Sequence, residues 1–222
     1  AAGGYDIVNP ATEQVVGVAP DASAEQAKAA GDAARAAFDG WARTSMEERC
    51  ALLDRFADVW DAHAAELVPL VQAETGATMR VAKTMQVPQA AARFRRYAQV
   101  ETNLVPLPPA VMPTTALAPG GIIGGVEHRA PVGVVAAIAA YNFPVTNMAG
   151  KIAPALAMGN TVVVKPPTQD PLGVIRMVEL FEEAGLPPGV VNTVSANTVE
   201  AAEAITGSPD VDMISFTGST GV

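Results

Sequence analysis

The chain has 222 residues, 50% of them hydrophobic, and a formal net charge of −9 at pH 7. This length and apolar content allow a sizeable buried core, in one domain or in two small ones. The acidic balance disfavours nucleic acid and anionic lipid as partners, because both require a basic face.

The sequence shows no pattern for disulfide bonding, metal binding or membrane insertion. Its single cysteine, Cys50, excludes an intrachain disulfide and a cysteine-cluster metal site. The two histidines, His63 and His128, lack metal-ligand spacing, and we predict no metal. No apolar run is long enough to cross a bilayer and no secretion signal is visible, which predicts a cytoplasmic protein.

The N-terminal part is predicted to form short strands and then helices. Residues 3–19 are expected to be strands around a turn, and Ser23 with Gln26 makes a capping-box start for an alanine-rich helix that ends near Phe38. Another helix, the third along the chain, is expected over residues 81–100. Three arginines near its C-terminal half are interpreted as a solvated face, and their positive charges suit the negative end of the helix dipole. These arginines are Arg93, Arg95 and Arg96.

Between these two helices, Ser45 with Glu48 makes a second capping box. The helix that it starts is expected to reach Gly76, with a kink or break at Pro69. Cys50 lies in this helix and is interpreted as a small buried residue, not as a nucleophile.

Two segments follow before the most informative part of the chain. Prolines are frequent between residues 105 and 119, which indicates an extended connector and not a regular element. Residues 120–129 have the composition of a strand that contains several glycines.

The stretch 131–167 predicts a β-α-β unit. An apolar run over residues 132–139 ends just before Asn142, a second run over residues 161–164 ends at Lys165, and residues 145–158 have helical spacing. A right-handed crossover brings the ends of two parallel strands to the same edge of a sheet, where ligands bind. Asn142 and Lys165 are therefore expected to face one crevice.

The side chains at this edge allow several roles. The amide of Asn142 could donate to an oxygen that gains negative charge, or the residue could simply form a turn. Lys165 could reach a phosphate or a ribose hydroxyl, or could be a solvated lysine at a strand end. Gly218 and Ser219 follow strand-like residues and could expose backbone N–H groups to a pyrophosphate. Lys151, inside the crossover helix, is typical of a surface lysine.

Strand-like runs at residues 190–194 and 213–217 alternate with helical patterns at 171–184 and 199–205. This alternation predicts an α/β fold with an open, mostly parallel, Rossmann-like sheet and helices on both faces. The N-terminal helices and a small projecting β segment complete the expected architecture.

Seven segments together resemble the N-terminal part of the aldehyde dehydrogenase superfamily, in the family's order and over nearly the whole chain. They are NPAT at 9–12, PVGV at 131–134, NFP at 142–144, KIAPALAMGN at 151–160, VKP at 164–166, EAGLP at 183–187 and ISFTGST at 214–220. The family reaction is attack of a cysteine thiolate on an aldehyde, hydride transfer to nicotinamide, and hydrolysis of the thioester.

The resemblance implies roles for individual residues. Asn142 matches the asparagine that stabilises the oxyanion, and Lys151 matches a lysine that some members use in a proton path. Lys165 matches the lysine that holds the adenosine ribose or its 2′-phosphate. NAD or NADP is expected to bind along a set of residues at the sheet edge. They are Ala140, Tyr141, Asn142, Lys165, Pro166, Pro167, Thr168, Gly218 and Ser219.

Four departures from the family pattern affect these expectations. Tyr141 replaces a common tryptophan, and Thr168 replaces the glutamate of NAD-preferring members, which favours tolerance of NADP. Residues 195–200 lack the usual glycines beside the adenine. The chain also ends at Val222, before the region that would hold the nucleophilic cysteine and the general-base glutamate.

By the resemblance, residues 1–104 are the N-terminal helical part of the cofactor-binding domain. Residues 105–130 are a connector with a projecting strand segment for oligomerisation, and residues 131–222 are an incomplete Rossmann-like core. A homodimer or homotetramer acting on a small aldehyde is expected for the complete enzyme. Two alternatives stay open: a non-catalytic nucleotide-binding or scaffolding module, and an enzyme that passes the acyl group to coenzyme A.

Overall fold

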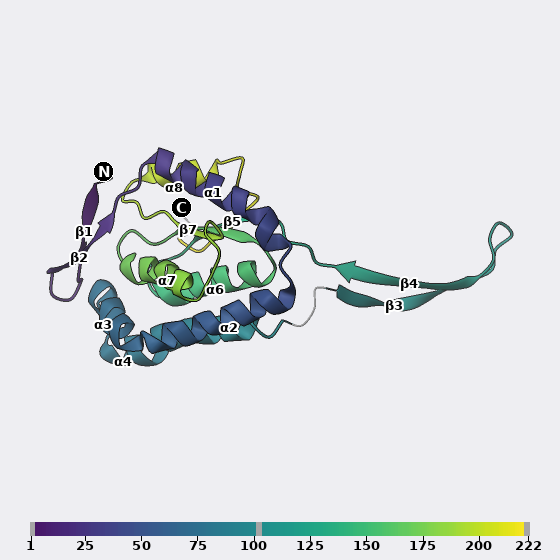
Figure 1. The fold of residues 1–222 in the computed structure, drawn as a ribbon, viewed down its shortest axis with the longest axis horizontal. Helices are drawn as coiled ribbons and strands as arrows, with labels where there is room; N and C mark the ends of the chain where they lie inside the picture. The colour runs from purple at the N-terminus through teal and green to yellow at the C-terminus, as the bar shows by residue number, and fades with distance from the viewer. Residues whose placement is uncertain (1–2, 101–103, 220–222) are drawn as a thin grey trace.

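A parallel sheet of four strands lies at the centre of the molecule, with the strand order β7-β6-β5-β8 (Figure 1). The computed structural model describes residues 3–100 and 104–219. The four strands are β5 (Val134–Ile138), β6 (Thr161–Lys165), β7 (Val191–Thr193) and β8 (Met213–Phe216). The strand order reverses between β5 and β8, which makes this the point where an open sheet binds ligands. The predicted α/β fold with an open parallel sheet is confirmed.

Helices cover both faces of this sheet, because the side chains of its strands alternate between two apolar clusters. Val134 and Ala136 pack toward α1 (Ala24–Ala42) and α8 (Val199–Thr206). Val135 and Ala137 pack toward the opposite face. That face is covered by α6 (Pro144–Ala157) and α7 (Leu172–Glu183), which lie below the sheet in Figure 1.

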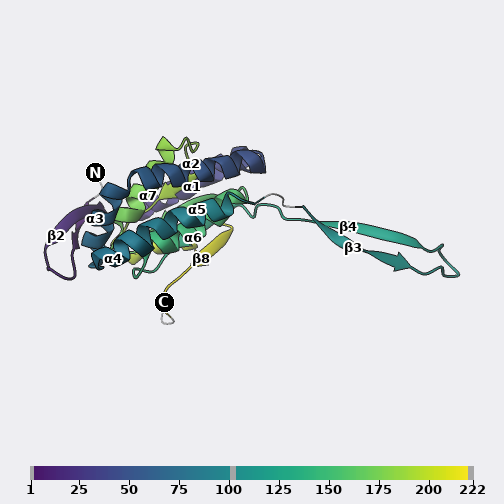
Figure 2. The same cartoon turned by 90° about the horizontal axis from the view of Figure 1, so that it is seen from below.

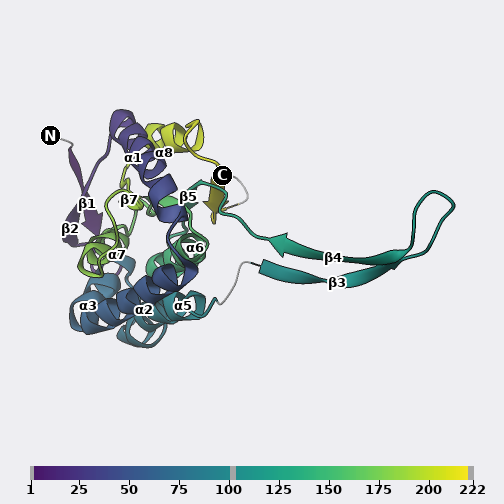
Figure 3. The ribbon, with the colours of Figure 1, turned by 45° about the vertical axis from the view of Figure 1, so that its right-hand side comes forward.

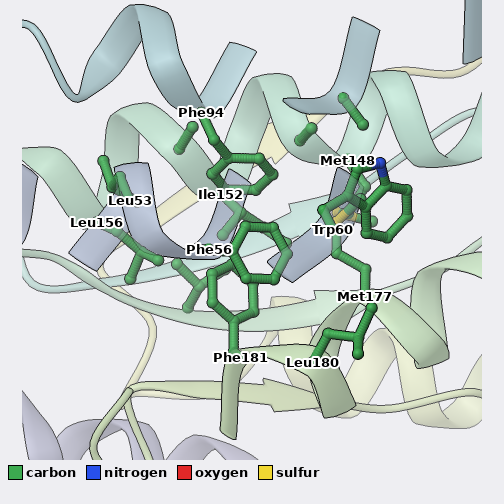
Figure 4. Close-up of a cluster of buried hydrophobic side chains, with 14 of the residues drawn as sticks. Leu53, Phe56, Trp60, Phe94, Met148, Ile152, Leu156, Met177, Leu180 and Phe181 are labelled. Carbon is green, nitrogen blue, oxygen red and sulfur yellow. The ribbon is translucent and has the colours of Figure 1, made fainter. Parts of the chain in front are cut away.

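A further helical layer packs on α6 and α7. It consists of α2 (Met46–Ala62), α3 (Ala64–Thr75) and α5 (Val87–Tyr97). Phe56 stacks on Phe181 with ring centroids 3.8 Å apart and meets Phe94 edge-on at 4.5 Å (Figure 4). The N-terminal helices therefore share one core with the sheet layer.

Both capping boxes form as predicted, at Ser23 with Gln26 and at Ser45 with Glu48. The first helix does not end near Phe38, as the sequence suggested, but continues to Ala42. Its last turn buries Trp41, which is 4% exposed, and this contact with the core holds the extra turn in place.

The break predicted at Pro69 was wrong, because the helix that starts after Ser45 ends at His63 instead. His63 has φ −89° and ψ 7°, and its carbonyl accepts the N–H groups that start α3. Pro69 lies inside α3, where it removes one hydrogen bond and is tolerated because Leu67 and Val71 are buried on either side of it. Gly76 ends the helix as expected, with φ 66°.

The single helix predicted over residues 81–100 is three segments in the structure. A short turn, α4 (Met79–Val81), leads into a π-helical segment, η1 (Ala82–Gln86), and then into α5. Pro88 is the second residue of α5, one residue after Val87. A proline cannot donate to the carbonyl four residues earlier and its ring crowds that carbonyl, and a wider π turn relieves both problems.

The proline-rich stretch is a strand and not the irregular connector that we predicted. β3 (Leu104–Met112) pairs antiparallel with β4 (Gly121–His128) in a long hairpin that projects from the body (Figure 3). The register shifts between Leu107 and Ala110, so the two prolines between them fall in a bulge. Each strand of a two-stranded ribbon also has a free edge, where a missing N–H costs no pairing.

A second hairpin, β1 (Gly4–Val8) with β2 (Val15–Pro20), forms as the sequence predicted. Thr220, the last residue of the segment ISFTGST, lies outside the described residues. Within residues 3–100 and 104–219, every helix is too short or too polar to cross a bilayer. The same residues hold no group of three or more His, Cys, Asp or Glu side chains arranged for a metal ion.

Candidate functional site

A cavity of about 600 Å³ lies at the carboxyl edge of the sheet, beyond the ends of β5, β6 and β8. Asn142 and Lys165 both line it, so the shared crevice expected from the β-α-β pattern is present. The other residues that line it come from the loops after the three strands. They are Ile138, Ala139, Ala140, Tyr141, Pro167, Thr168, Gln169, Phe216, Thr217, Gly218 and Ser219.

Asn142 lies in the turn between β5 and α6, and its side chain is accessible from the crevice. Its Oδ1 accepts a hydrogen bond from Nδ2 of Asn147, at 3.3 Å, one turn into α6. This bond orients the amide, and its NH₂ group has no partner among the described residues. An oriented neutral donor of this kind can stabilise an oxygen on which negative charge develops.

Lys165 is the last residue of β6 and is half-buried. Its Nζ donates to Oγ1 of Thr168 at 3.1 Å, and that hydroxyl in turn donates to the carbonyl of Ala196 at 3.3 Å. Burial lowers the pKa of Lys165. No carboxylate of the described residues forms an ion pair with it, so the ammonium can donate to a phosphate oxygen or a ribose hydroxyl.

The loop from β6 to α7, which carries Thr168, is held by a residue from α3. The two carboxylate oxygens of Glu74 accept the backbone N–H groups of Leu172, at 2.6 Å, and Gly173, at 2.9 Å. Glu74 thus caps the first turn of α7, where a negative charge interacts favourably with the positive end of the helix dipole. Glu74 therefore has a structural role at this point.

A second carboxyl group, Asp170, lies buried beside this cap. Burial raises the pKa of Glu74 to about 7. Burial, together with the charge of Glu74, raises the pKa of Asp170 to about 9. The crevice loop therefore sits on a pair of carboxyl groups that titrate near neutral pH and above.

A second cavity of about 510 Å³ continues from the first and shares Ile138, Lys165, Thr168 and Phe216 with it. Its far wall is the start of α8, where apolar and polar side chains alternate. These residues are Asn197, Thr198, Val199, Ala202, Glu203 and Thr206, together with Ile214 of β8. The family resemblance implied that residues 195–200 border the adenine, and Asn197, Thr198 and Val199 of this wall fall in that range. The rest of the wall on α8 was not identified from the sequence, because it carries no recognisable binding motif.

Three residues that the sequence singled out lie outside the crevice. Lys151 donates to Oγ of Ser215 at 3.3 Å and lines a separate cavity of about 270 Å³, and burial lowers its pKa. Pro166 is buried and is not among the residues that line the crevice. Cys50 is 8% exposed, and its thiol points to backbone carbonyls at the end of α5, away from the crevice. Burial raises the pKa of Cys50, and its interpretation as a small buried residue is confirmed.

The crevice fits a dinucleotide in shape and in donor chemistry. The two adjoining cavities extend from Asn142 across Lys165 to α8. At Gly218 an added Cβ would overlap the ring of Phe216, so the lack of a side chain lets this ring lie against the loop at the end of β8. The backbone of this glycine-containing loop, next to the available ammonium group of Lys165, suits a phosphate-bearing ligand.

Comparison with known proteins agrees with this geometry. The model of the aldehyde dehydrogenase family matches residues 1–222. The chain belongs to the aldehyde dehydrogenase family. Its relatives include a 2-aminomuconic semialdehyde dehydrogenase of Bos taurus, 37% identical over 96% of this chain, and a phenylacetaldehyde dehydrogenase of Pseudomonas fluorescens, 38% identical over 98%.

Among solved structures, an aldehyde dehydrogenase from Bacillus cereus in complex with NAD+ is similar to this chain, and the match covers 99% of this chain. Its TM-score is 0.85 and its sequence identity is 34%. The chain spans less than half the length of these proteins: 42% of the Bos taurus protein, 43% of the Pseudomonas protein and 43% of the Bacillus structure.

Proposed function

We propose that the complete protein oxidises an aldehyde to a carboxylic acid with NAD or NADP, and that this chain supplies the cofactor crevice and the oxyanion donor. The observation that carries the proposal is the single cavity lined by Asn142, Lys165 and the Gly218-Ser219 loop. Membership of the aldehyde dehydrogenase family supports the same reaction.

Each residue of the crevice has a proposed task. The amide of Asn142 donates to the substrate oxygen when a nucleophile attacks the carbonyl, and again when the thioester is hydrolysed. Lys165 holds the ribose hydroxyls or a 2′-phosphate, and the backbone N–H groups at Gly218 and Ser219 face the pyrophosphate. When bound, the nicotinamide accepts a hydride from the carbon that carries the oxyanion. The remaining proposed contacts come from Ala140, Tyr141, Pro166, Pro167 and Thr168.

The nucleophile is proposed to come from outside these 222 residues. Cys50 is the only cysteine in the sequence, and it is buried in α2 with its thiol on the carbonyls of Tyr97 and Val100. A cysteine in such a position cannot reach an aldehyde in the crevice.

Thr168 leads us to propose that NADP is accepted as well as NAD. Its hydroxyl lies 3.1 Å from Nζ of Lys165, so the position carries no negative charge. A carboxylate there would bond the ribose hydroxyls and repel a 2′-phosphate, and the threonine removes this repulsion.

The projecting hairpin supports a proposed assembly into a homodimer or homotetramer. Several of its apolar side chains are exposed, among them Val111 at 79% and Ile122 at 76%. A long ribbon with free edges and exposed apolar residues is stable in water when another chain covers it.

The names of the relatives do not fix a substrate, since one is named for a semialdehyde and another for phenylacetaldehyde. A second candidate function is a non-catalytic nucleotide-binding module. An acyl transfer to coenzyme A is a third.

The test is to titrate the complete protein with NAD and NADP and then add an aldehyde. Formation of reduced cofactor together with free acid supports the proposal. Cofactor binding with no reduction by any aldehyde favours the binding module, and reduction that requires coenzyme A favours the acylating enzyme. No binding of either cofactor would overturn the assignment of the crevice.

A further inference from the structure

Gly150 lies in the middle of α6 on its accessible face, a position where alanine would stabilise the helix more than glycine does. The atoms nearest to a side chain added there all belong to Arg93 of α5, and an added Cβ would overlap its guanidinium. The lack of a side chain at Gly150 therefore leaves the space in which the guanidinium of Arg93 lies across α6.

Arg93 differs from the arginine two residues after it, although the sequence suggested one solvated face for both. Arg95 forms ion pairs with Asp58, at 2.8 Å, and with Asp61, at 2.7 Å. Arg93 is exposed and makes no hydrogen bond or ion pair with a described residue. Its guanidinium is placed by packing but keeps all its donors available.

The guanidinium is close to the proposed oxyanion donor. Asn147 lies three residues before Gly150 on the same face of α6, and it donates to Asn142 at 3.3 Å. Three residues of helix rise by roughly 5 Å, so the point on α6 that Arg93 covers lies about one helical turn from Asn147. Figure 2 shows α5 beside α6, next to β8.

The surroundings of Arg93 are cationic, although the chain as a whole has a net charge of −9. Neither α5 nor α6 contains an aspartate or a glutamate. Lys151 adds a further positive charge on the same face of α6, one residue after Gly150. An anion that lies along this face meets attraction from both helices.

We propose that Arg93 is a specificity residue that binds a carboxylate at the far end of the substrate, so that the enzyme prefers aldehydes that carry a carboxylate over neutral aldehydes of the same length. This inference rests on the proposed dehydrogenase function. The planar fork of an arginine donates two parallel hydrogen bonds to a carboxylate, which a lysine cannot do. A separation of about one helical turn along α6 suits a short carbon chain between the two groups.

The test compares adipic semialdehyde with hexanal as substrates of the complete enzyme. Arg93→Gln is expected to lower kcat/KM for adipic semialdehyde about 10- to 100-fold, mainly through KM, because hydrogen bonds to charged groups are lost. For hexanal the change is expected to stay within about twofold. Arg43→Gln is the control, since it removes an equal charge at the exposed C-cap of α1, on the other face of the sheet.

Gly150→Ala gives an independent test that keeps the charge. The added methyl displaces the guanidinium of Arg93, which is the end of a flexible side chain, so the fold is expected to remain as stable as before or slightly more so. The preference for adipic semialdehyde over hexanal is expected to fall about 5- to 50-fold, because the displaced guanidinium of Arg93 no longer donates two parallel hydrogen bonds to the substrate carboxylate. Arg93→Lys is expected to recover only part of the preference.

Equal losses for both substrates in Arg93→Gln would overturn the inference, because they would mean that Arg93 pairs with a carboxylate of the protein. Unchanged kinetics with both substrates would overturn it as well. If the wild-type enzyme oxidises neither aldehyde with either cofactor, the proposed function itself fails. That outcome is recognised from the wild-type protein before any variant is made.

Discussion

The aromatic layer between α2 and α7 packs on one face of the sheet and the crevice lies at its carboxyl edge, and the two regions are built in opposite ways. Phe56, Phe94 and Phe181 are at most 1% exposed and contact one another closely. In the crevice, Tyr141 is 63% exposed and Asn142 is accessible. The difference teaches that stability and chemistry come from separate sets of residues, and this separation can be tested.

The largest effect is expected in the aromatic layer. Phe56→Ala removes a ring that stacks on Phe181 and meets Phe94, and it should lower the free energy of unfolding by about 3–5 kcal/mol. Denaturant titration of the complete protein measures it. Phe38→Ala, at a partly exposed ring, is the control and should cost about 1 kcal/mol or less. Similar losses from both would show that the layer is not the main stabilising core.

Asn142→Ala addresses the other side of the comparison. Turnover should fall on the order of 100-fold or more, because one oxyanion donor is lost, while cofactor affinity and stability barely change. Steady-state kinetics and cofactor titration on the same preparation give both values. If affinity falls as far as turnover, Asn142 is a structural residue and the two regions are not separate.

Asp170 lies buried in the loop from β6 to α7, next to the crevice, and it predicts a dependence of stability on pH. Its pKa is raised in the folded protein, so between about pH 4 and pH 9 the folded state holds a proton that the unfolded state has released. The contribution of Asp170 to stability is therefore full at acidic pH and is lost as the pH rises through this window.

Asp170→Asn should remove that slope. The variant should match the wild type near pH 4 and exceed it by about 1–2 kcal/mol near pH 9, after allowance for partial solvation. Thermal unfolding at a series of pH values measures the difference. A constant difference at every pH would show that the carboxyl group is not the one that titrates.

The smallest expected effect is a change of cofactor preference. Thr168→Glu places a carboxylate beside Lys165 and should weaken NADP binding about tenfold relative to NAD, because it repels the 2′-phosphate. Separate titrations with the two cofactors measure the ratio. An unchanged ratio, or strict NAD selectivity in the wild type, would mean that another residue of the crevice discriminates.

The central part of the fold could be predicted from the sequence because its signals are local. The apolar runs of β5 and β6, the capping boxes at Ser23 and Ser45, and Gly76 as a helix end each depend on a few neighbouring residues. A parallel crossover then fixes where Asn142 and Lys165 lie relative to each other. Both line the crevice for this reason.

The errors occurred where distant packing outweighed a local signal. The break at His63 instead of Pro69 depends on how α3 buries Leu67 against the core. The prolines of β3 indicated a connector, but they are accommodated by a bulge and by a partner strand. The part of the second cavity formed by α8 beyond residue 200, and the place of Arg93 over Gly150, follow only from three-dimensional contacts.

The carboxylate of Glu74 reaches across 98 positions of the chain to the first turn of α7. The loop that presents Thr168 thus takes its anchor from the N-terminal helices. In chimeras that exchange the first 76 residues with those of a relative, the foreign segment would bring its own anchor, or none. Cofactor affinity should then change with the origin of a segment that does not line the second cavity, between Lys165 and α8, at all.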